Sequence, residues 1–204
     1  LEFRRVLFRS QCNVFKTRTL LIDSKTNTNI GKSPLFPKYE TFADFLSNTI
    51  IGKRKHTISE FFYRTQHIQQ LGGYQIYPAG YYADDASILL FCNNNGIAST
   101  EESLIVYRKS ENNISSSSCW NVEKSKAALK YYQWIIDEFP MKQQDEQIIQ
   151  QRLDFDLYTY FSAALNIHQS IQILNCIPVN IWNWKKKLLC LYKFILNSYA
   201  KQIK

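Results

Sequence analysis

Apolar residues recur every three or four positions in several parts of the chain, a spacing that predicts α-helices with one buried face. One such stretch covers residues 42–50 and is followed by Gly52, where a C-terminal cap is expected. A longer one lies between Asn121, which we expect to cap the helix, and Pro140, which ends it. The apolar positions are Phe42, Phe45, Leu46 and Ile50 in the first helix, and Ala128, Leu129, Tyr132, Ile135, Ile136 and Phe139 in the second.

Two shorter helices are expected between these stretches. Thr65 can cap a helix over residues 66–71, which the glycine pair at 72–73 ends. The other helix runs from about Asp85 to Asn95 and stops at Gly96. In both cases the glycines are the signal that places the end of the helix.

Alternating or aromatic stretches predict strands over residues 12–21, 59–64 and 103–108. Residues 22–40 and 74–82 contain Pro and Gly and are predicted to be looped or extended. Strands that alternate with helices indicate an α/β layer, and three strands are too few to close a sheet comfortably alone.

Beyond Met141 the pattern is Gln-rich and helical up to Pro178, which breaks it. The last segment predicts an amphipathic helix. Its apolar face consists of Leu188, Leu191, Tyr192, Ile195, Leu196, Tyr199 and Ile203, and the opposite face carries Lys186, Lys193, Lys201 and Lys204. Two interpretations are open. The apolar stripe packs onto the domain, or the segment, with Trp182 and Trp184 ahead of it, makes a peripheral contact with an anionic membrane.

The composition suits one ordinary globular domain, because 45% of the 204 residues are hydrophobic and 15% are aromatic. The formal net charge of +8 favours acidic partners, whether nucleotide phosphates, nucleic acid or an anionic membrane. Five scattered cysteines without a C-x-x-C pair indicate buried thiols in a reducing compartment. The three histidines, His56, His67 and His168, are isolated, so a histidine-based metal site is not expected.

The first ten residues, LEFRRVLFRS, resemble a translated sequencing-library adapter. One back-translation, CTG GAG TTC AGA CGT GTG CTC TTC CGA TCT, looks like a common short-read adapter at every position. We therefore treat residues 1–10 as a non-native artefact and leave them out of the fold prediction; the alternative is a basic amphipathic N-terminus. Without them the net charge falls from +8 to +6, because three arginines and one glutamate are removed. Native sequence is expected to be missing upstream of residue 11.

Two adjacent carboxylates, Asp84 and Asp85, lie between an aromatic run and an apolar one in the stretch PAGYYADDASILLF. Acids at the start of a helix accept hydrogen bonds from its first N–H groups and complement its dipole, together contributing about 1 kcal/mol. Local chemistry alone therefore explains the pair as a feature that stabilises a helix N-terminus. The motifs around the pair suggest a second explanation.

The acidic pair belongs to an ordered series of short motifs. These are Phe62 and Arg64 in a strand, Gly72, Gly73 and Tyr74 after a short helix, and Asp84 and Asp85 at the start of the next helix. Tyr107, Arg108 and Ser110 follow, and then Asn113, Ile114 and Ser115. This order resembles the C-terminal half of bacterial family-2 glycosyltransferases, which are inverting enzymes of the GT-A fold. The resemblance covers about residues 12–139, and it rests on the ordered set, since no single motif is specific.

The resemblance implies an α/β fold. Residues 11–140 would form the acceptor-side half of an incomplete GT-A (nucleotide-diphospho-sugar transferase-like) domain, and residues 141–204 an α-helical extension with a basic amphipathic end. It also implies transfer of a sugar, with inversion, from a nucleotide-sugar donor to a hydroxyl of a glycan or lipid-linked acceptor. Such enzymes act in polysaccharide biosynthesis, in the cytoplasm or at the inner face of the plasma membrane.

In such an enzyme a carboxylate removes the proton of the acceptor hydroxyl while the nucleoside diphosphate leaves from the opposite face of the sugar. The family's motif places this base at Asp85, with Asp84 as its orienting partner, and a shift of one position in the alignment would exchange the two roles. Tyr81 and Tyr82 are candidates for a platform on which a sugar stacks, although simple packing explains them equally well.

Three further charged residues are candidates for the site. Arg108 and Lys124 could contact phosphate or acceptor groups, but a lone cation beside a strand or at a helix start is more often solvated. Glu60 is a weaker candidate and could equally be a structural partner of Arg64.

The divalent metal of this family, Mg²⁺ or Mn²⁺, is held by an Asp-x-Asp motif in the nucleotide-binding half, which we expect upstream of this chain. The letters DFD at residues 154–156 fit the motif but lie in a late helical segment, where we interpret them as a solvated helix face. Without a cationic clamp the leaving diphosphate is poorly stabilised, so the chain alone is expected to be inactive.

The alternative function is a non-enzymatic basic binding module, or a catalytically dead homologue, that acts at a membrane surface. Nucleic acid is not an expected partner, because the lysines concentrate at the C-terminus and the aromatic residues follow the periodicity of a core. The donor sugar, the linkage and the oligomeric state are not encoded in any motif of this chain.

Overall fold

A computed structural model describes residues 11–54, 57–93, 95–109 and 117–202. The adapter-like residues 1–10 and several positions of the downstream motifs (Ser110, Asn113, Ile114 and Ser115) lie outside the described residues.

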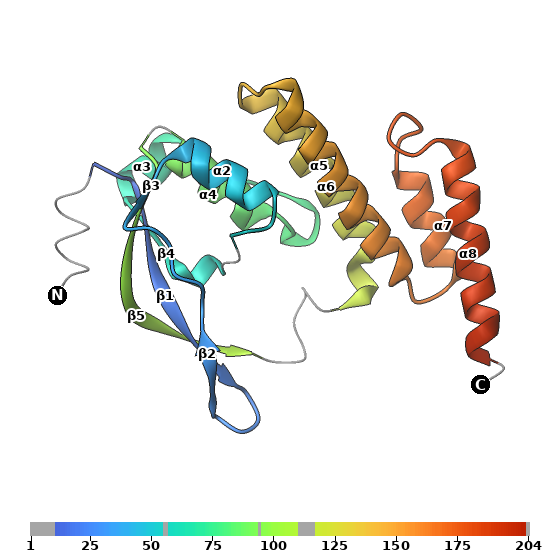
Figure 1. The fold of residues 1–204 in the computed structure, drawn as a ribbon, viewed down its shortest axis with the longest axis horizontal. Helices are drawn as coiled ribbons and strands as arrows, with labels where there is room; N and C mark the ends of the chain where they lie inside the picture. Colours follow the sequence, from blue (N-terminus) through green and yellow to red (C-terminus); the bar gives the residue numbers. More distant parts are fainter. Residues whose placement is uncertain (1–10, 55–56, 94, 110–116, 203–204) are drawn as a thin grey trace. The chain divides into compact units, whose positions relative to one another are not determined.

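The chain forms two units, and each is described by itself. A mixed α/β unit comprises residues 11–76 and 83–109, and a helical unit comprises residues 77–82 and 117–202 (Figure 1). The division differs from the predicted boundary at residue 140, because the helix before Pro140 and the short loop 77–82 both pack within the helical unit.

The α/β unit is built on a curled sheet of five strands (Figure 1). They are β1 (Val14–Asp23), β2 (Asn29–Lys32), β3 (Tyr39–Glu40), β4 (Phe61–Tyr63) and β5 (Ile97–Lys109). One edge of β1 pairs in parallel with β5, and the other edge pairs antiparallel with β4 near the start of β1 and with β2 near its end. β3 adds to the far side of β5 as an antiparallel strand.

The three predicted strands are confirmed as β1, β4 and β5. The predicted loop over residues 22–40 is wrong in part, because it contains β2 and β3. β2 forms a hairpin with β1 through a turn in which the Asp23 carboxylate accepts hydrogen bonds from the N–H groups of Lys25 and Thr26, each 2.8 Å long. With four residues and little apolar alternation, β2 gives no strand pattern of its own.

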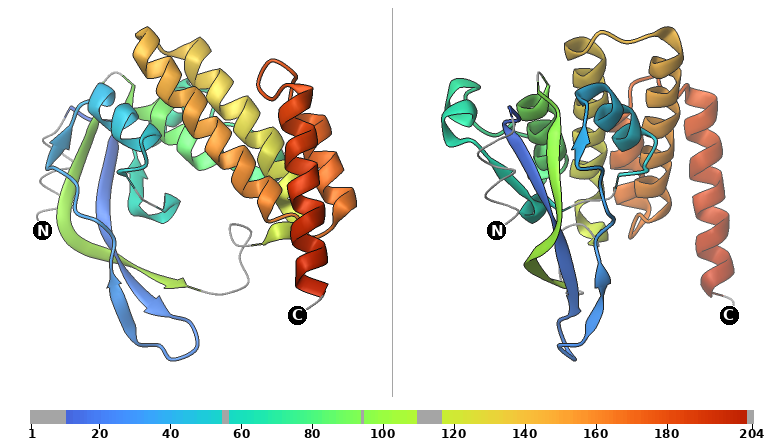
Figure 2. Two further views of the ribbon diagram at one scale, coloured as in Figure 1. Left: turned by 45° about the vertical axis from the view of Figure 1, so that its right-hand side comes forward. Right: turned by 60° about the vertical axis from the view of Figure 1, so that its left-hand side comes forward.

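Outside the strands, most of the buried apolar residues of this unit belong to two helices. α2 (Phe42–Ile50) buries Phe45, Leu46 and Ile50 as predicted, and Thr41 caps it by accepting a 3.2 Å hydrogen bond from the Asp44 N–H. α4 (Ala83–Cys92) is buried along most of its length and contacts both α2 and β1. Figure 2 shows both helices beside the sheet.

The starts of two helices differ from the prediction by one or two residues. α3 (Thr65–Gln70) includes Thr65 as its first residue, so Arg64 occupies the N-cap position and the cap predicted for Thr65 is wrong. The Arg64 Nε atom instead donates a 3.0 Å hydrogen bond to the Cys12 carbonyl beside the sheet. α4 begins at Ala83, which places the acidic pair inside its first turn.

Two ion pairs, one buried and one with a partly buried arginine, lie in the α/β unit. Lys16 Nζ is 3.0 Å from Glu60 Oε2, and Arg54 Nη2 is 2.6 Å from Glu40 Oε1. Both cations also approach the ring of Phe36, at 4.1 Å for Lys16 and 4.8 Å for the Arg54 guanidinium carbon. The ion pair of Glu60 is therefore with Lys16 and not with Arg64, the alternative structural partner that the sequence offers.

The helical unit contains α5 (Asn121–Glu138), α6 (Gln143–Ser162), α7 (Ile167–Cys176) and α8 (Trp184–Gln202), seen from two sides in Figure 2. α5 packs against α6 and α7, and α8 lies against α7. Asn121 does not cap α5 as predicted. It is the first residue of the helix, and its amide donates to the carbonyls of Tyr160 and Ala163 at 3.0 and 3.1 Å, which ties the start of α5 to the end of α6.

The single long helical stretch predicted between Met141 and Pro178 is in fact two helices, α6 and α7. Asn166 caps α7 by accepting a 2.9 Å hydrogen bond from the Gln169 N–H, and Gln169 Oε1 accepts one of 2.8 Å from the Leu165 N–H. The first bond satisfies one of the free N–H groups at the start of α7, and the second holds the residue before the cap, so together they favour a break in the chain direction before Asn166. Across the described part of the chain, no helix combines the length and the apolar character that crossing a membrane requires.

Candidate functional site

The acidic pair occupies the first turn of α4, where both carboxylates are half-buried. Ser87 holds the start of this helix in place. Its hydroxyl donates a 2.5 Å hydrogen bond to the Ala83 carbonyl and accepts one of 2.9 Å from the Gln75 N–H. Because Ser87 itself is completely buried, it fixes the loop before the helix relative to the turn that carries Asp84 and Asp85.

An aromatic cluster lies beside the acidic pair. Tyr63 from β4, Tyr74 from the loop after α3 and Phe91 from α4 meet edge to face, with ring centroids 5.3 to 6.1 Å apart. Burial raises the pKa of the Tyr63 hydroxyl, and the charges of Tyr74, Asp84 and Asp85 raise it further.

The hydroxyl group of Tyr63 is buried, and within the described part of the chain no hydrogen-bond partner for it is found. Tyr74, by contrast, is 50% exposed. The acidic pair therefore borders an aromatic cluster with one half-buried tyrosine, whose hydroxyl is buried, and one exposed tyrosine. This combination of carboxylate and flat ring surface suits a polyhydroxylated ligand such as a sugar.

The two candidate tyrosines directly before α4 belong to the helical unit. Tyr82 stacks on Tyr131 of α5, with ring centroids 4.7 Å apart and an interplanar angle of 16°. Its backbone has φ = +64°, and Ala79 three residues earlier has φ = +52°, a region that costs residues other than glycine roughly 1 kcal/mol or more. Such a conformation persists only when surrounding contacts hold it.

Those contacts converge on Asp156 in α6. The Tyr82 hydroxyl donates to the Asp156 carboxylate at 3.0 Å and lies 2.9 Å from the Tyr160 hydroxyl, and the Tyr132 hydroxyl donates to the same carboxylate oxygen at 2.6 Å. Arg152 lies 3.4 Å from the other oxygen. Burial is the main cause that raises the pKa of the hydroxyls of Tyr82, Tyr132 and Tyr160.

The prediction that residues 154–156 form a solvated helix face is therefore wrong for Asp156, while Phe155 is exposed and Asp154 is half-buried. Asp156 is only 7% exposed. Asp154 accepts hydrogen bonds from the indole N–H of the buried Trp182 and from the Lys186 ammonium. Asp154 and Asp156 therefore both accept hydrogen bonds within the helical unit.

The two predicted cations have different environments. Lys124 is buried, its ammonium donates a 2.8 Å hydrogen bond to the Ser117 carbonyl, and it lies 5.2 Å from the centroid of the Tyr81 ring. Desolvation lowers the pKa of Lys124. Arg108 is exposed near the end of β5. The structure thus places Lys124 next to Tyr81 in the helical unit. Asp84 and Asp85 share the first turn of α4, and Arg108 lies in the same α/β unit as this pair.

Sequence reasoning did not predict the contributions of Tyr63, Tyr74 and Asp156. Tyr74 follows the glycine pair, and the sequence analysis names it only as part of that motif, without a role at the site. Tyr63 and Asp156 come from a strand and a helix far from the acidic pair in sequence, so no local spacing could have indicated them.

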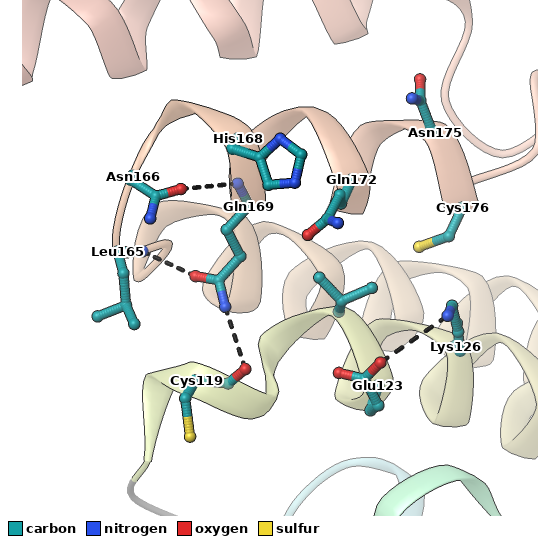
Figure 3. A pocket seen from close by; sticks show the side chains of 11 residues that line it. Cys119, Glu123, Lys126, Leu165, Asn166, His168, Gln169, Gln172, Asn175 and Cys176 are labelled. Carbon is teal, nitrogen blue, oxygen red and sulfur yellow. Dashed lines mark hydrogen bonds and ion pairs between the residues drawn. The ribbon is translucent and has the colours of Figure 1, made fainter.

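An open pocket of about 620 Å³ lies between α5 and α7 of the helical unit (Figure 3). Its walls carry His168, the Glu123–Lys126 ion pair at 3.9 Å, and the thiols of Cys119 and Cys176. The buried Gln169 braces one side by donating to the carbonyls of Ser118 and Cys119. None of the six predicted site residues lines this pocket.

Comparison of the chain with protein-family models, with curated proteins and with solved structures found no match in any of the three. What the structure itself defines is a mixed α/β unit with an acidic pair at a helix start and a helical unit with a buried tyrosine–aspartate cluster. Within the part of the chain that the structure describes, no group of three or more His, Cys, Asp or Glu side chains is arranged to hold a metal ion.

Proposed function

We propose that this chain forms the acceptor side of an inverting, GT-A-type glycosyltransferase, which transfers a sugar from a nucleotide-sugar donor to a hydroxyl of a glycan or lipid-linked acceptor. The observation that carries the proposal is the half-buried acidic pair in the first turn of α4, next to the ring cluster of Tyr63 and Tyr74. The ordered motifs around this pair supply the resemblance to the family.

In this proposal Asp85 is the general base. Its carboxylate accepts the proton of the acceptor hydroxyl as the hydroxyl oxygen attacks the anomeric carbon, and the bond from that carbon to the nucleoside diphosphate breaks on the opposite face. Asp84, on the adjacent position of the same turn, orients the acceptor or the base. A half-buried carboxylate suits this task, because it is accessible to a substrate while its charge is only partly hydrated.

The aromatic residues and cations have supporting roles. The exposed face of Tyr74 offers a surface for the apolar side of a sugar ring. Tyr81 and Lys124, which lie together within the helical unit, are kept as candidates for acceptor contacts. Arg108 is exposed and is assigned to acceptor or phosphate groups. The Mg²⁺ or Mn²⁺ ion of the family is assigned to the nucleotide-binding half, and no step above depends on it.

The reaction class is tested with the complete open reading frame that contains this chain. The protein is incubated with a panel of nucleotide sugars and glycan acceptors, release of nucleoside diphosphate is followed, and the anomeric configuration of the product is determined by NMR. We expect acceptor-dependent release and a product whose anomeric configuration is opposite to that of the donor. Retention of configuration, or no acceptor-dependent release with any donor, would contradict the proposal.

A further inference from the structure

The last helix directs its apolar side chains away from the helices that it packs on. In the described part of α8, six large apolar side chains are between 38% and 61% exposed: Trp184, Leu188, Leu189, Tyr192, Ile195 and Leu196. Four of the seven residues predicted to form its apolar face are among them. The interpretation that this stripe packs onto the domain is therefore wrong for these four positions.

The opposite side of α8 holds the helix to its unit. Cys190 is buried, and the Phe194 ring lies 5.9 Å from the ring of Phe161 in α6. The Lys187 ammonium donates to the Ile177 carbonyl after α7, and Lys186 pairs with Asp154. At about 100° per residue, positions 190 and 194 lie roughly opposite positions 188, 192 and 195, so the exposed residues form one continuous outer face.

The charge of α8 is entirely positive. Residues 184–202 contain five lysines, at positions 185, 186, 187, 193 and 201, and no aspartate or glutamate. Two of these lysines, Lys186 and Lys187, are engaged within the unit, whereas Lys185 and Lys193 are exposed. At about 100° per residue, Lys185 lies within the outer face and Lys193 lies at its edge. The outer face of α8 thus combines aliphatic side chains, a tryptophan, a tyrosine and cations.

We infer that the outer face of α8 docks on the surface of an anionic lipid bilayer, with the helix axis parallel to the membrane plane. Leu188, Leu189, Ile195 and Leu196 would enter the boundary of the acyl chains. The rings of Trp184 and Tyr192 suit the headgroup level, where one side of the ring is apolar and the other is hydrated. Lys185 and Lys193 would contact lipid phosphates.

Charge favours a bilayer over a second copy of this chain. A symmetric dimer through the same face would bring the lysines of both helices together without an acid on either helix to compensate them. The inference is independent of the proposed sugar transfer, because no residue of the acidic pair or of the aromatic cluster takes part in it.

Vesicle sedimentation tests the inference directly on this chain. The probes are vesicles of phosphatidylcholine alone and of an equimolar mixture of phosphatidylcholine and phosphatidylglycerol. We expect binding to the anionic vesicles that is about tenfold or more tighter than to neutral ones and that weakens as salt is added. We also expect a blue shift of tryptophan emission with anionic vesicles that the Trp184→Phe variant loses, since Trp182 is already buried.

Matched variants separate the contributions of the face. Leu188→Ser with Tyr192→Ser should lower binding about tenfold or more, and Lys193→Gln about fivefold. Ile76→Ser, which removes an equally apolar side chain that is 84% exposed in the α/β unit, should leave binding unchanged. Circular dichroism and thermal unfolding of each variant identify any loss that comes from misfolding.

Three outcomes would overturn the inference. One is equal or absent binding to both kinds of vesicle. Another is an equal loss of binding with Ile76→Ser and with the α8 variants. The third is a concentration-dependent dimer, seen by analytical ultracentrifugation, that Leu188→Ser with Tyr192→Ser dissociates, because the face would then be covered by a second copy.

Discussion

Burial separates the acids of this chain into two groups at the scale of single residues. Glu60 and Asp156 are buried, and each is engaged by neighbours that come from distant parts of the sequence. Asp84 and Asp85 are half-buried in a helix turn. A buried acid with a fixed partner stabilises a fold, whereas an accessible one can exchange a proton with a ligand, so the acidic pair is the better candidate for chemistry.

Removal of the Glu60 carboxylate should destabilise the protein strongly. The Glu60→Ala variant leaves the Lys16 ammonium in the core without its counter-ion, and we expect a loss of about 3–5 kcal/mol in the free energy of unfolding. Urea denaturation measures this loss. Glu138→Ala, at an exposed position of α5, is the control and should change stability by less than about 0.5 kcal/mol. Similar stabilities for the two variants would show that the Lys16–Glu60 pair is not needed in the core.

The buried tyrosines predict alkaline unfolding. The folded-state pKa of the hydroxyls of Tyr82, Tyr132 and Tyr160 is raised above the ordinary value of 10.0, mainly by burial, and that of Tyr77 is raised to about 12. Their preference for the neutral form therefore stabilises the fold fully below pH 10.0, and this contribution is lost as the pH rises further.

Tyrosinate absorbance and far-ultraviolet circular dichroism, followed together during an alkaline titration, measure this effect. We expect a group of tyrosines to ionise only as the helical signal disappears. Ionisation of all thirteen tyrosines near the ordinary pKa, with the helices intact, would contradict the buried cluster.

At the scale of elements, the break between α6 and α7 depends on one side chain. Gln169 accepts a hydrogen bond from the Leu165 N–H and donates two to the carbonyls of Ser118 and Cys119. We expect Gln169→Ala to lower the free energy of unfolding by about 2 kcal/mol, because these buried groups lose their partner. Gln172→Ala, in the same helix but exposed, should have little effect. Thermal unfolding of the two variants compares them, and an equal midpoint would show that the cap is dispensable.

Helices and strands were predicted well where the residues that indicate them lie close together in the sequence. The apolar stripe and Gly52 gave α2 nearly to the residue, because the spacing and the terminating glycine both lie within ten positions. β2 was missed since its residues become a strand only through pairing with β1. The α6–α7 break was missed although Asn166 and Gln169 form a recognisable N-x-x-Q capping pattern, because the apolar periodicity continues across it.

At the scale of the whole molecule, the helical unit includes α5, α6 and the loop 77–82. A chain truncated after Pro140 would expose the buried face of α5 and would remove Asp156 and Tyr160 from the tyrosine cluster. We expect this truncated chain to aggregate or to lose the near-ultraviolet circular dichroism of its aromatic residues. A soluble, cooperatively folded fragment of residues 11–140 would support the boundary predicted from sequence instead.

The candidate site was predictable only in part. The acidic pair and its two preceding tyrosines are adjacent in sequence, so a local motif could indicate them. The partners that hold Tyr82 lie 74 and 78 residues further along the chain, in a helix whose own pattern gives no sign of this contact. The buried hydroxyl of Tyr63 likewise depends on a strand and a helix meeting in space.

In the proposed reaction Asp85 accepts the proton of a sugar acceptor. The most direct test of this claim is the turnover of the Asp85→Asn variant in the full reading frame, with the donor affinity measured in parallel by calorimetry and with Asp137→Asn, an exposed acid of α5, as the control. We predict that turnover falls about 1,000-fold in Asp85→Asn, while donor affinity and the activity of the control stay close to the unmodified enzyme. Turnover of Asp85→Asn close to that of the unmodified enzyme would contradict the claim.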